Sequence, residues 1–255
     1  MYASAPVDIP RLFLVARSLP VRHGFSLRKG GVSPGERASL DLGPAGDLPP
    51  DAWENRRRLA QAAGLDPARL VTAHQVHGTR VVRGVAGAAM EADCLWTDAV
   101  GTWVGIRTAD CVPLLLADVR GTRVAAVHSG WRGTEARIAA AAVSVLDAEG
   151  TSPSQLRAAI GPCIGRCCYE VGEDLAERFG RAFGDSVIDR SSGQRPHLDL
   201  RHAVRLTLQA AGVAAEAIED VPGCTACDAE AFFSHRRDRG RTGRHLAFVA
   251  PGALS

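Results

Sequence analysis

The chain has 255 residues, of which 46% are hydrophobic and 23% are charged. This composition excludes a disordered protein and predicts a buried core. Because 30 basic residues nearly balance 28 acidic ones, the net charge of +2 favours neither nucleic acid nor an anionic membrane surface as a partner.

The sequence predicts a soluble protein of the cytoplasm. Residues 1–22 lack a basic region followed by an unbroken apolar run, so no secretion signal is expected. Apolar stretches such as Val112–Ala117 are far shorter than the roughly 20 residues that cross a bilayer. Seven cysteines, an odd number without an export signal, favour reduced thiols, some of them ligands, over a disulfide framework.

The first half of the chain predicts one helix followed by strands. Apolar periodicity over Trp53–Ala63, ending at Gly64, indicates the helix, and Pro44–Pro50 before it indicates a surface loop. A strand-like stretch then runs from Val71 to Val82. Three more strands are expected, the last two joined as a hairpin by the turn at 119–122: Thr102–Thr108, Val112–Asp118 and Arg123–His128.

Helices and strands alternate in the second half. Good helix formers over Glu135–Ala148 follow Thr134, which is expected to cap that helix. Strands are expected at Leu156–Ile160, His197–Leu200 and Leu246–Val249, and helices at Glu173–Phe183 and Ala203–Ala211. The fold class is therefore mixed α/β, and the lack of a repeat or long linker favours one domain.

Three residues at the ends of predicted strands carry side chains that bind zinc: His74, Cys111 and His128. Imidazole and thiolate together favour zinc, and three protein ligands leave a fourth position for water or substrate, as in catalytic zinc sites. Their spacing matches no local zinc signature, so from spacing alone a structural role in the core is the competing interpretation.

Longer strings resemble the YfiH family, also called the laccase-domain or multicopper polyphenol oxidase family and the peptidoglycan editing factor. They follow one another in order between residues 23 and 249. These segments are His23–Ser26 with Gly30–Ser33, Asn55-Arg56, Thr72–Gly78, Thr108–Pro113, Ala126–Thr134, Ile160–Ile164 with Cys168–Gly172, and Phe232–Asp238 with Thr242–Arg244.

The resemblance implies a layered α-β-β-α fold, with 23–255 as a single catalytic domain and 1–22 as its N-terminal segment. It implies a zinc site formed by His74, Cys111 and His128, which then also serve in catalysis. The implied activity is phosphorolysis of adenosine, inosine and methylthioadenosine, with deamination of adenosine. The expected partners are therefore a small-molecule nucleoside and phosphate.

The laccase name implies copper in place of zinc and oxidation of phenols. Several copper ions need about ten His, Cys and Met ligands, whereas the chain has eight His and two Met in all. Zinc is therefore the expected cofactor, and copper is the alternative occupant.

Further residues are candidates for the reaction. Asp110 and His77 are candidates for a general acid or base, and Asp110 could instead orient a histidine ligand. Arg132, at a helix start after His128, is expected to bind phosphate, with a structural salt bridge as the alternative. Arg56 and Gln75 are expected to reach the substrate, although Arg56 fits a solvated helix face equally well.

The remaining cysteines allow more than one interpretation. Cys224 and Cys227 have the spacing of half a zinc ribbon or of a redox pair, but no second pair with that spacing exists, so a structural role is expected. Cys163, Cys167 and Cys168 lie in a predicted loop that borders the site, where a reactive thiol and a packing role are both open.

Other functions compete with the nucleoside enzyme. A zinc amidase acting on cytoplasmic peptidoglycan precursors would use the same zinc site. Without a metal, Cys111 and His128 could act as a nucleophile and base in a hydrolase. A fourth protein ligand would instead make the chain a non-catalytic metal-binding protein.

Overall fold

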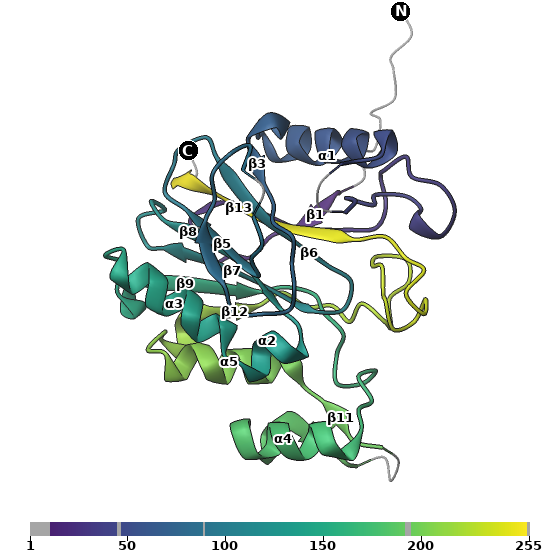
Figure 1. The fold of residues 1–255 in the computed structure, drawn as a ribbon, viewed down its shortest axis with the longest axis vertical. Coiled ribbons are helices and arrows are strands. Elements are labelled where there is room, and N and C mark those ends of the chain that lie inside the picture. Colours follow the sequence, from purple (N-terminus) through teal and green to yellow (C-terminus); the bar gives the residue numbers. More distant parts are fainter. Residues whose placement is uncertain (1–10, 45–46, 89, 192–194, 254–255) are drawn as a thin grey trace, which may run out of the picture.

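The computed structural model describes residues 11–44, 47–88, 90–191 and 195–253 (Figure 1). Two β-sheets lie face to face, and helices cover the outer face of each sheet, which confirms the predicted mixed α/β class and its layers. Among the described residues, no helix is both long and apolar enough to span a bilayer.

The five-stranded sheet has the order β1-β2-β13-β6-β3. All its neighbours are antiparallel except β3, which runs parallel to β6. Its strands are β1 (Phe13–Leu14), β2 (Val21–Ser26), β13 (His245–Ala253), β6 (Trp103–Thr108) and β3 (Leu70–Val71). Helix α1 (Pro50–Ala63) packs Leu59 and Ala60 against Trp103 and Phe248 of this sheet.

The six-stranded sheet has the order β12-β9-β7-β8-β5-β4. Its strands are β12 (Ile218–Asp220), β9 (Leu156–Ile160), β7 (Val112–Asp118), β8 (Val124–Ser129), β5 (Cys94–Thr97) and β4 (Val81–Arg83). On its outer face lie α2 (Trp131–Glu135), α3 (Ile138–Ala148) and α5 (Leu200–Ala210).

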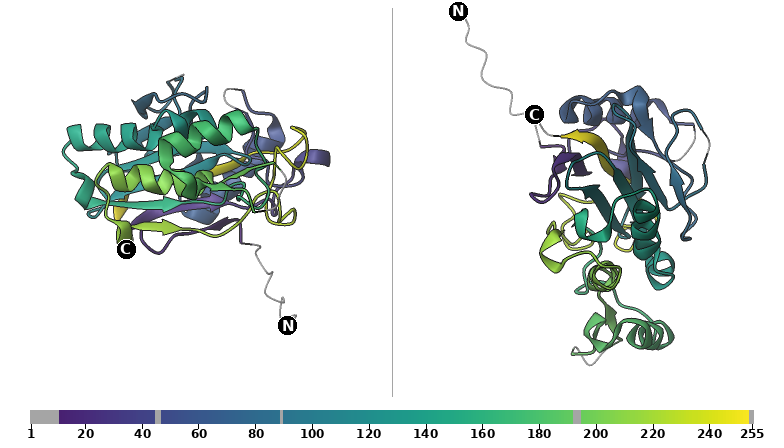
Figure 2. Two further views of the ribbon diagram at one scale, coloured as in Figure 1. Left: turned by 90° about the horizontal axis from the view of Figure 1, so that it is seen from below. Right: turned by 90° about the vertical axis from the view of Figure 1, so that its left-hand side faces the viewer.

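Smaller elements complete the fold. Helix α4 (Glu173–Phe183) and the antiparallel pair of β10 (Ile188–Asp189) and β11 (His197–Leu198) lie at one end of the body, as Figure 2 shows in its right-hand view. Within the described ranges the chain also forms five short 3₁₀ helices, η1 (Gly35–Arg37), η2 (Pro67–Arg69), η3 (Pro153–Gln155), η4 (Asp185–Val187) and η5 (Ala215–Ala217).

Strand β7 shows how the sequence builds these layers. Its side chains are buried on both faces: Leu114 and Leu116 pack with the helices, and Leu115 and Ala117 pack with the other sheet. Successive side chains of a strand point to opposite faces, so an unbroken apolar run is required here. Each buried leucine stabilises the fold by roughly 1.5–3 kcal/mol.

Most predicted elements are confirmed. The bounds of β7, β9 and α4 agree with the prediction, and β7 and β8 form the predicted hairpin. Helix α1 ends at Ala63, and Gly64, with φ of 65°, is its C-cap. Residues 45 and 46 of the predicted loop at Pro44–Pro50, and 1–10 of the predicted N-terminal segment, lie outside the described residues.

Three predictions about local structure are wrong in whole or in part. The strand predicted at His197–Leu200 ends at Leu198, because Asp199 caps α5 and Leu200 begins it. The stretch from Val71 to Val82 is not one strand, because the chain leaves β3 after Val71 and forms a loop before β4. Thr134 does not cap a helix: it lies buried inside α2, where its hydroxyl bonds to that of Ser129 at 2.8 Å. The break between α2 and α3 falls at Arg137, whose φ is 64°.

Candidate active site

Three segments that are distant in sequence meet at one end of the sheets. His77 lies in the loop after β3, Cys111 directly precedes β7, and His128 is on β8. Their ligand atoms all lie within 4.8 Å of one another. The two imidazole rings meet edge to face with centroids 4.8 Å apart. We call these residues the His77–Cys111–His128 triad.

The triad differs from the predicted ligand set at one position, because it contains His77 instead of His74. The backbone of His74 is extended: its N–H donates to the carbonyl of Met90, and its carbonyl accepts from the N–H of Ala92. The loop then turns at His77, where φ is 61°, and brings that imidazole to Cys111 and His128. His74 lines the same cavity outside the triad.

Asp93 organises the triad, although the sequence analysis did not identify it. Its buried carboxylate accepts hydrogen bonds from the backbone N–H groups of the loop at 76–78, at 2.7 to 3.2 Å. It also lies 2.7 Å from Nδ1 of His128. That contact fixes the imidazole orientation and leaves Nε2 as the ligand atom.

Pairing between strands explains the place of Asp93. It directly precedes β5, and β5 pairs with β8 so that Cys94 lies opposite Val127. The carbonyl of Asp93 consequently accepts from the backbone N–H of His128 at 2.7 Å. The local sequence signal that could have identified Asp93 is an aspartate directly before an apolar strand.

The charges of these groups are coupled. Burial acts to raise the pKa of Asp93, but the hydrogen bonds from His128 and Gly78 hold it below its usual value. Burial acts to lower the pKa of His128, but Cys111 and Asp93 raise it to about 9. The pKa of His77 is lowered by burial and by His128.

Gly130 permits the close approach of two members of the triad. A Cβ atom at this position would lie 2.6 Å from Nδ1 of His77 and 3.1 Å from Sγ of Cys111. Both distances are shorter than an ordinary van der Waals contact. A side chain at 130 would therefore displace the ligands, which explains why glycine follows His128-Ser129 in this motif.

Asp110 lies beside Cys111 and makes two hydrogen bonds to a distant segment. It adopts φ of 93°, and its two carboxylate oxygens accept from Oγ1 of Thr225 at 2.5 Å and from the backbone N–H of Arg236 at 2.6 Å. Asp93, and not Asp110, is thus the partner of a histidine in the triad. The two hydrogen bonds of Asp110 hold the segment at 225–236 next to Cys111.

The triad opens onto a cavity of about 590 Å³. This volume lies in the range of about 300–1,000 Å³ typical of sites for small molecules. The lining residues beyond the triad are Gly43, Pro44, His74, Gln75, Arg107, Thr108, Ala109, Asp110, Trp131, Ile164, Tyr169, His235, Arg236 and Arg244. The cavity therefore combines several aromatic rings with three guanidinium groups.

Arg107 is the most distinctive of these cations. Its Nη2 donates to the carbonyl of Ala73 at 2.9 Å, while its buried Nη1 has no hydrogen-bond partner. Burial, together with the nearby charge of Arg244, lowers the pKa of Arg107 to about 10. An unpartnered buried guanidinium nitrogen is costly, and an anionic ligand in the cavity would satisfy it.

The three predicted substrate residues differ in where they lie relative to the cavity. Gln75 lines the cavity, but its amide makes two hydrogen bonds of 2.8 Å with the backbone of Arg107 and so braces that strand. Arg56 donates hydrogen bonds to the carbonyls of Leu42 and Pro44. Its side chain therefore packs on the neighbouring loop and does not lie on a solvated helix face. Arg132 is exposed, stacks on Trp131 at 4.4 Å and is not a lining residue.

The donor set of the triad fits a transition metal ion. Two imidazoles and one thiolate, within reach of one ion, match the three protein ligands of a catalytic zinc site. The cavity on the open side of the triad provides room for a substrate at the fourth position. Asp93 supplies the hydrogen bond that metal-binding histidines usually make through their other nitrogen.

Comparison with known proteins agrees with this architecture. Residues 22–251 match the family model described as "Multi-copper polyphenol oxidoreductase laccase". A purine nucleoside phosphorylase of Deinococcus radiodurans is 42% identical over 238 residues, which cover 92% of this chain and 91% of that protein. Adenosine deaminase RL5, from an unknown prokaryotic organism, is 36% identical, with 89% and 94% covered.

A solved structure shows the same fold. The crystal structure of YlmD from Geobacillus stearothermophilus matches with a TM-score of 0.87 and 34% identity, over 95% of this chain and 99% of that chain. Fold and site thus define a laccase-like α/β protein with a candidate metal centre. The chain belongs to the YfiH family, as its motifs predicted.

Proposed function

We propose that this protein is a zinc-dependent purine nucleoside phosphorylase that acts on adenosine, inosine and methylthioadenosine. The observation that carries the proposal is the shared cavity of the His77–Cys111–His128 triad and the unpartnered Nη1 of Arg107. A relative that is 42% identical bears the name purine nucleoside phosphorylase, which supports the same reaction.

Zinc held by His77, Cys111 and His128 would supply Lewis acidity at one side of the cavity. The chain's own residues then divide the remaining work. Arg107 and Arg244 line the cavity and are the proposed phosphate ligands, because guanidinium groups bind phosphate oxygens in a bidentate geometry. They replace Arg132, which lies outside the lining.

Phosphorolysis joins a phosphate oxygen to C1′ of the ribose as the bond from C1′ to the purine nitrogen breaks. Negative charge develops on the leaving purine, which takes its proton from solvent or from phosphate. Two lining residues are candidates to stabilise that charge by a hydrogen bond, Tyr169 and His235. Burial, followed by the negative charge of Cys111, raises the pKa of Tyr169 to about 12, so its hydroxyl keeps its proton. A neutral hydroxyl can donate a hydrogen bond to the base.

Deamination of adenosine is a second candidate activity, which the name of the 36% identical adenosine deaminase favours. In that reaction water adds to C6 of the adenine ring and ammonia leaves, so the base and not C1′ of the ribose would be the attacked group. The two activities differ in one requirement, since only phosphorolysis consumes phosphate.

The experiment follows hypoxanthine release from inosine with and without phosphate. We expect release that requires phosphate, is abolished in Cys111→Ala, and shows a strongly raised KM for phosphate in Arg107→Gln. Arg132→Gln is the matched control and should retain the phosphate KM of the wild type, because Arg132 does not line the cavity.

Two results would exclude the proposal. Zinc-loaded protein without phosphate-dependent release would leave the amidase acting on peptidoglycan precursors as the next hypothesis. Oxidation of phenols that follows copper content, with no release of base, would favour the polyphenol oxidase named by the family model.

A further inference from the structure

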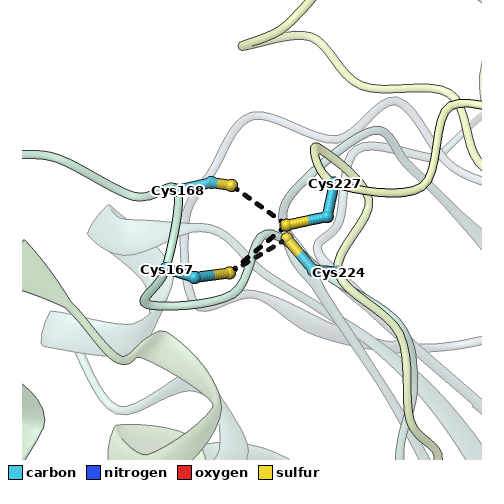
Figure 3. Close-up of side chains that lie close together, drawn as sticks. All are labelled: Cys167, Cys168, Cys224 and Cys227. Atoms are coloured by element: carbon cyan, nitrogen blue, oxygen red, sulfur yellow. Dashed lines mark hydrogen bonds between the residues drawn. The ribbon is translucent and has the colours of Figure 1, made fainter.

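Four cysteines form a second cluster (Figure 3), which shares no residue with the triad. Cys167 and Cys168 lie in the segment between β9 and α4, and Cys224 and Cys227 lie in the segment after β12. All four sulfur atoms are within 4.8 Å of one another. The distance from Cys227 is 3.5 Å to Cys167 and 3.3 Å to Cys168, and Cys167 lies 3.7 Å from Cys224.

These distances match four ligands around one ion. Zinc binds cysteine sulfur at about 2.3 Å in a tetrahedron, which places the sulfur atoms roughly 3.8 Å apart. We propose that Cys167, Cys168, Cys224 and Cys227 bind one zinc ion in a closed, four-thiolate structural site. Because four protein ligands complete the tetrahedron, this ion would have no open position for a substrate.

The backbone around the cluster is arranged for thiolates. The N–H of Gly165 donates to Sγ of Cys224 at 3.2 Å, a contact that stabilises a metal-bound thiolate. A Cβ on Gly165 would lie 3.1 Å from Sγ of Cys167 and 3.4 Å from Sγ of Cys224. Glycine at 165 therefore leaves room for the sulfur atoms of Cys167 and Cys224.

Backbone pairing fixes the two segments relative to each other. Cys163 and Cys224 form a parallel bridge, and the N–H of Thr225 donates to the carbonyl of Cys163 at 3.0 Å. The cluster is thus held by the fold as well as by its own side chains. Cys163 itself is buried, with its sulfur near Arg201, and does not belong to the cluster.

The proposed ion would join two walls of the active-site cavity. The first segment contributes Ile164 and Tyr169 to the lining, and the second leads to His235 and Arg236. The guanidinium of Arg236 lies over the Tyr169 ring at 5.2 Å, so the walls also meet at the cavity. We expect loss of the ion to raise KM for the nucleoside more than it lowers kcat; this expectation rests on the proposed function, whereas the metal site does not.

The test is the metal content of folded protein purified under reducing conditions. We expect two zinc ions per wild-type chain, one in Cys111→Ala, and one in the double variant Cys224→Ser/Cys227→Ser. Cys94→Ala is the matched control, because Cys94 is buried on β5 outside both clusters and its variant should keep both ions.

Cobalt in place of zinc provides a second readout that does not require the double variant to fold. Cys111→Ala loaded with Co²⁺ should show the intense thiolate-to-metal absorption of a tetrahedral four-sulfur site. Folded Cys111→Ala that binds no metal would overturn the proposal, whatever the enzymatic result. So would the finding by mass spectrometry that the four cysteines form disulfides, each with the loss of two hydrogens, in reductant-treated protein.

Discussion

Asp93→Asn tests whether one buried carboxylate assembles the triad. The substitution preserves the size of the side chain but removes its charge. It also places an NH₂ group where the structure has an acceptor for Nδ1 of His128 or for the backbone N–H groups at 76–78. At least one donor then faces another donor, and at least one buried polar group loses its partner.

The expected magnitude follows from these contacts. A hydrogen bond to a charged group contributes about 1.5–3 kcal/mol, so we expect the free energy of unfolding of the metal-free protein to fall by at least that amount. Loss of a partner behind a metal ligand weakens metal binding about 10- to 100-fold. Both effects should appear in the same variant.

The assays are denaturant unfolding of metal-free protein and zinc competition with a chromophoric chelator. Asp98→Asn is the matched control, since Asp98 pairs with exposed Arg83 and should change stability by less than about 1 kcal/mol. The stability advantage of wild type over Asp93→Asn should be present at neutral pH and shrink in acid, because the pKa of Asp93 is held low in the folded state. Equal zinc affinity in Asp93→Asn and Asp98→Asn would refute the proposal that Asp93 assembles the triad.

Three further predictions concern glycine, a buried histidine and the core. Gly130→Ala should fold but bind zinc at least about tenfold more weakly by chelator competition, because its Cβ would contact His77 and Cys111; unchanged affinity would contradict the close approach. Burial lowers the pKa of His245 to about 3, so wild-type stability should fall as the pH drops from about 6.5 towards 3, since only the unfolded state gains that proton. In His245→Gln the free energy of unfolding should change less steeply with pH in that interval, by up to about 1.4 kcal/mol per pH unit. An unchanged slope in unfolding titrations would exclude His245 as the cause of the pH dependence. Leu115→Ala, between the two sheets, should cost about 2–5 kcal/mol by denaturant unfolding, and a loss below 1 kcal/mol would contradict the packing.

The sequence was sufficient where local periodicity and burial agree. Val112–Ala117 is an unbroken apolar run buried on both faces, and the helix at Glu173–Phe183 has one apolar side that packs Ala176 and Phe179. The loop after β3 was misread because the strand-like residues Val71 and Val82 belong to two separate strands, β3 and β4, with the loop between them. The fold of that loop depends on Asp93, which lies far along the chain from β3.

The candidate site was predicted in part. Cys111 and His128 lie together as expected, because each is at the end of one of two paired strands. The sequence offered two histidines in His74-Gln75-Val76-His77, and the choice between them depends on the backbone turn at His77. Arg107 and Arg244 were missed, since they meet only through the pairing of β6 with β13 and the segment preceding β13.

The measurement that tests the central claim most directly compares His77→Ala with His74→Ala, for zinc content and for phosphate-dependent release of hypoxanthine from inosine. We predict that His77→Ala loses the ion of the triad and with it the release of base. His74→Ala should retain that ion and measurable phosphorolysis. Loss of the ion in His74→Ala with retention in His77→Ala, or phosphorolysis that persists without His77, would contradict the account.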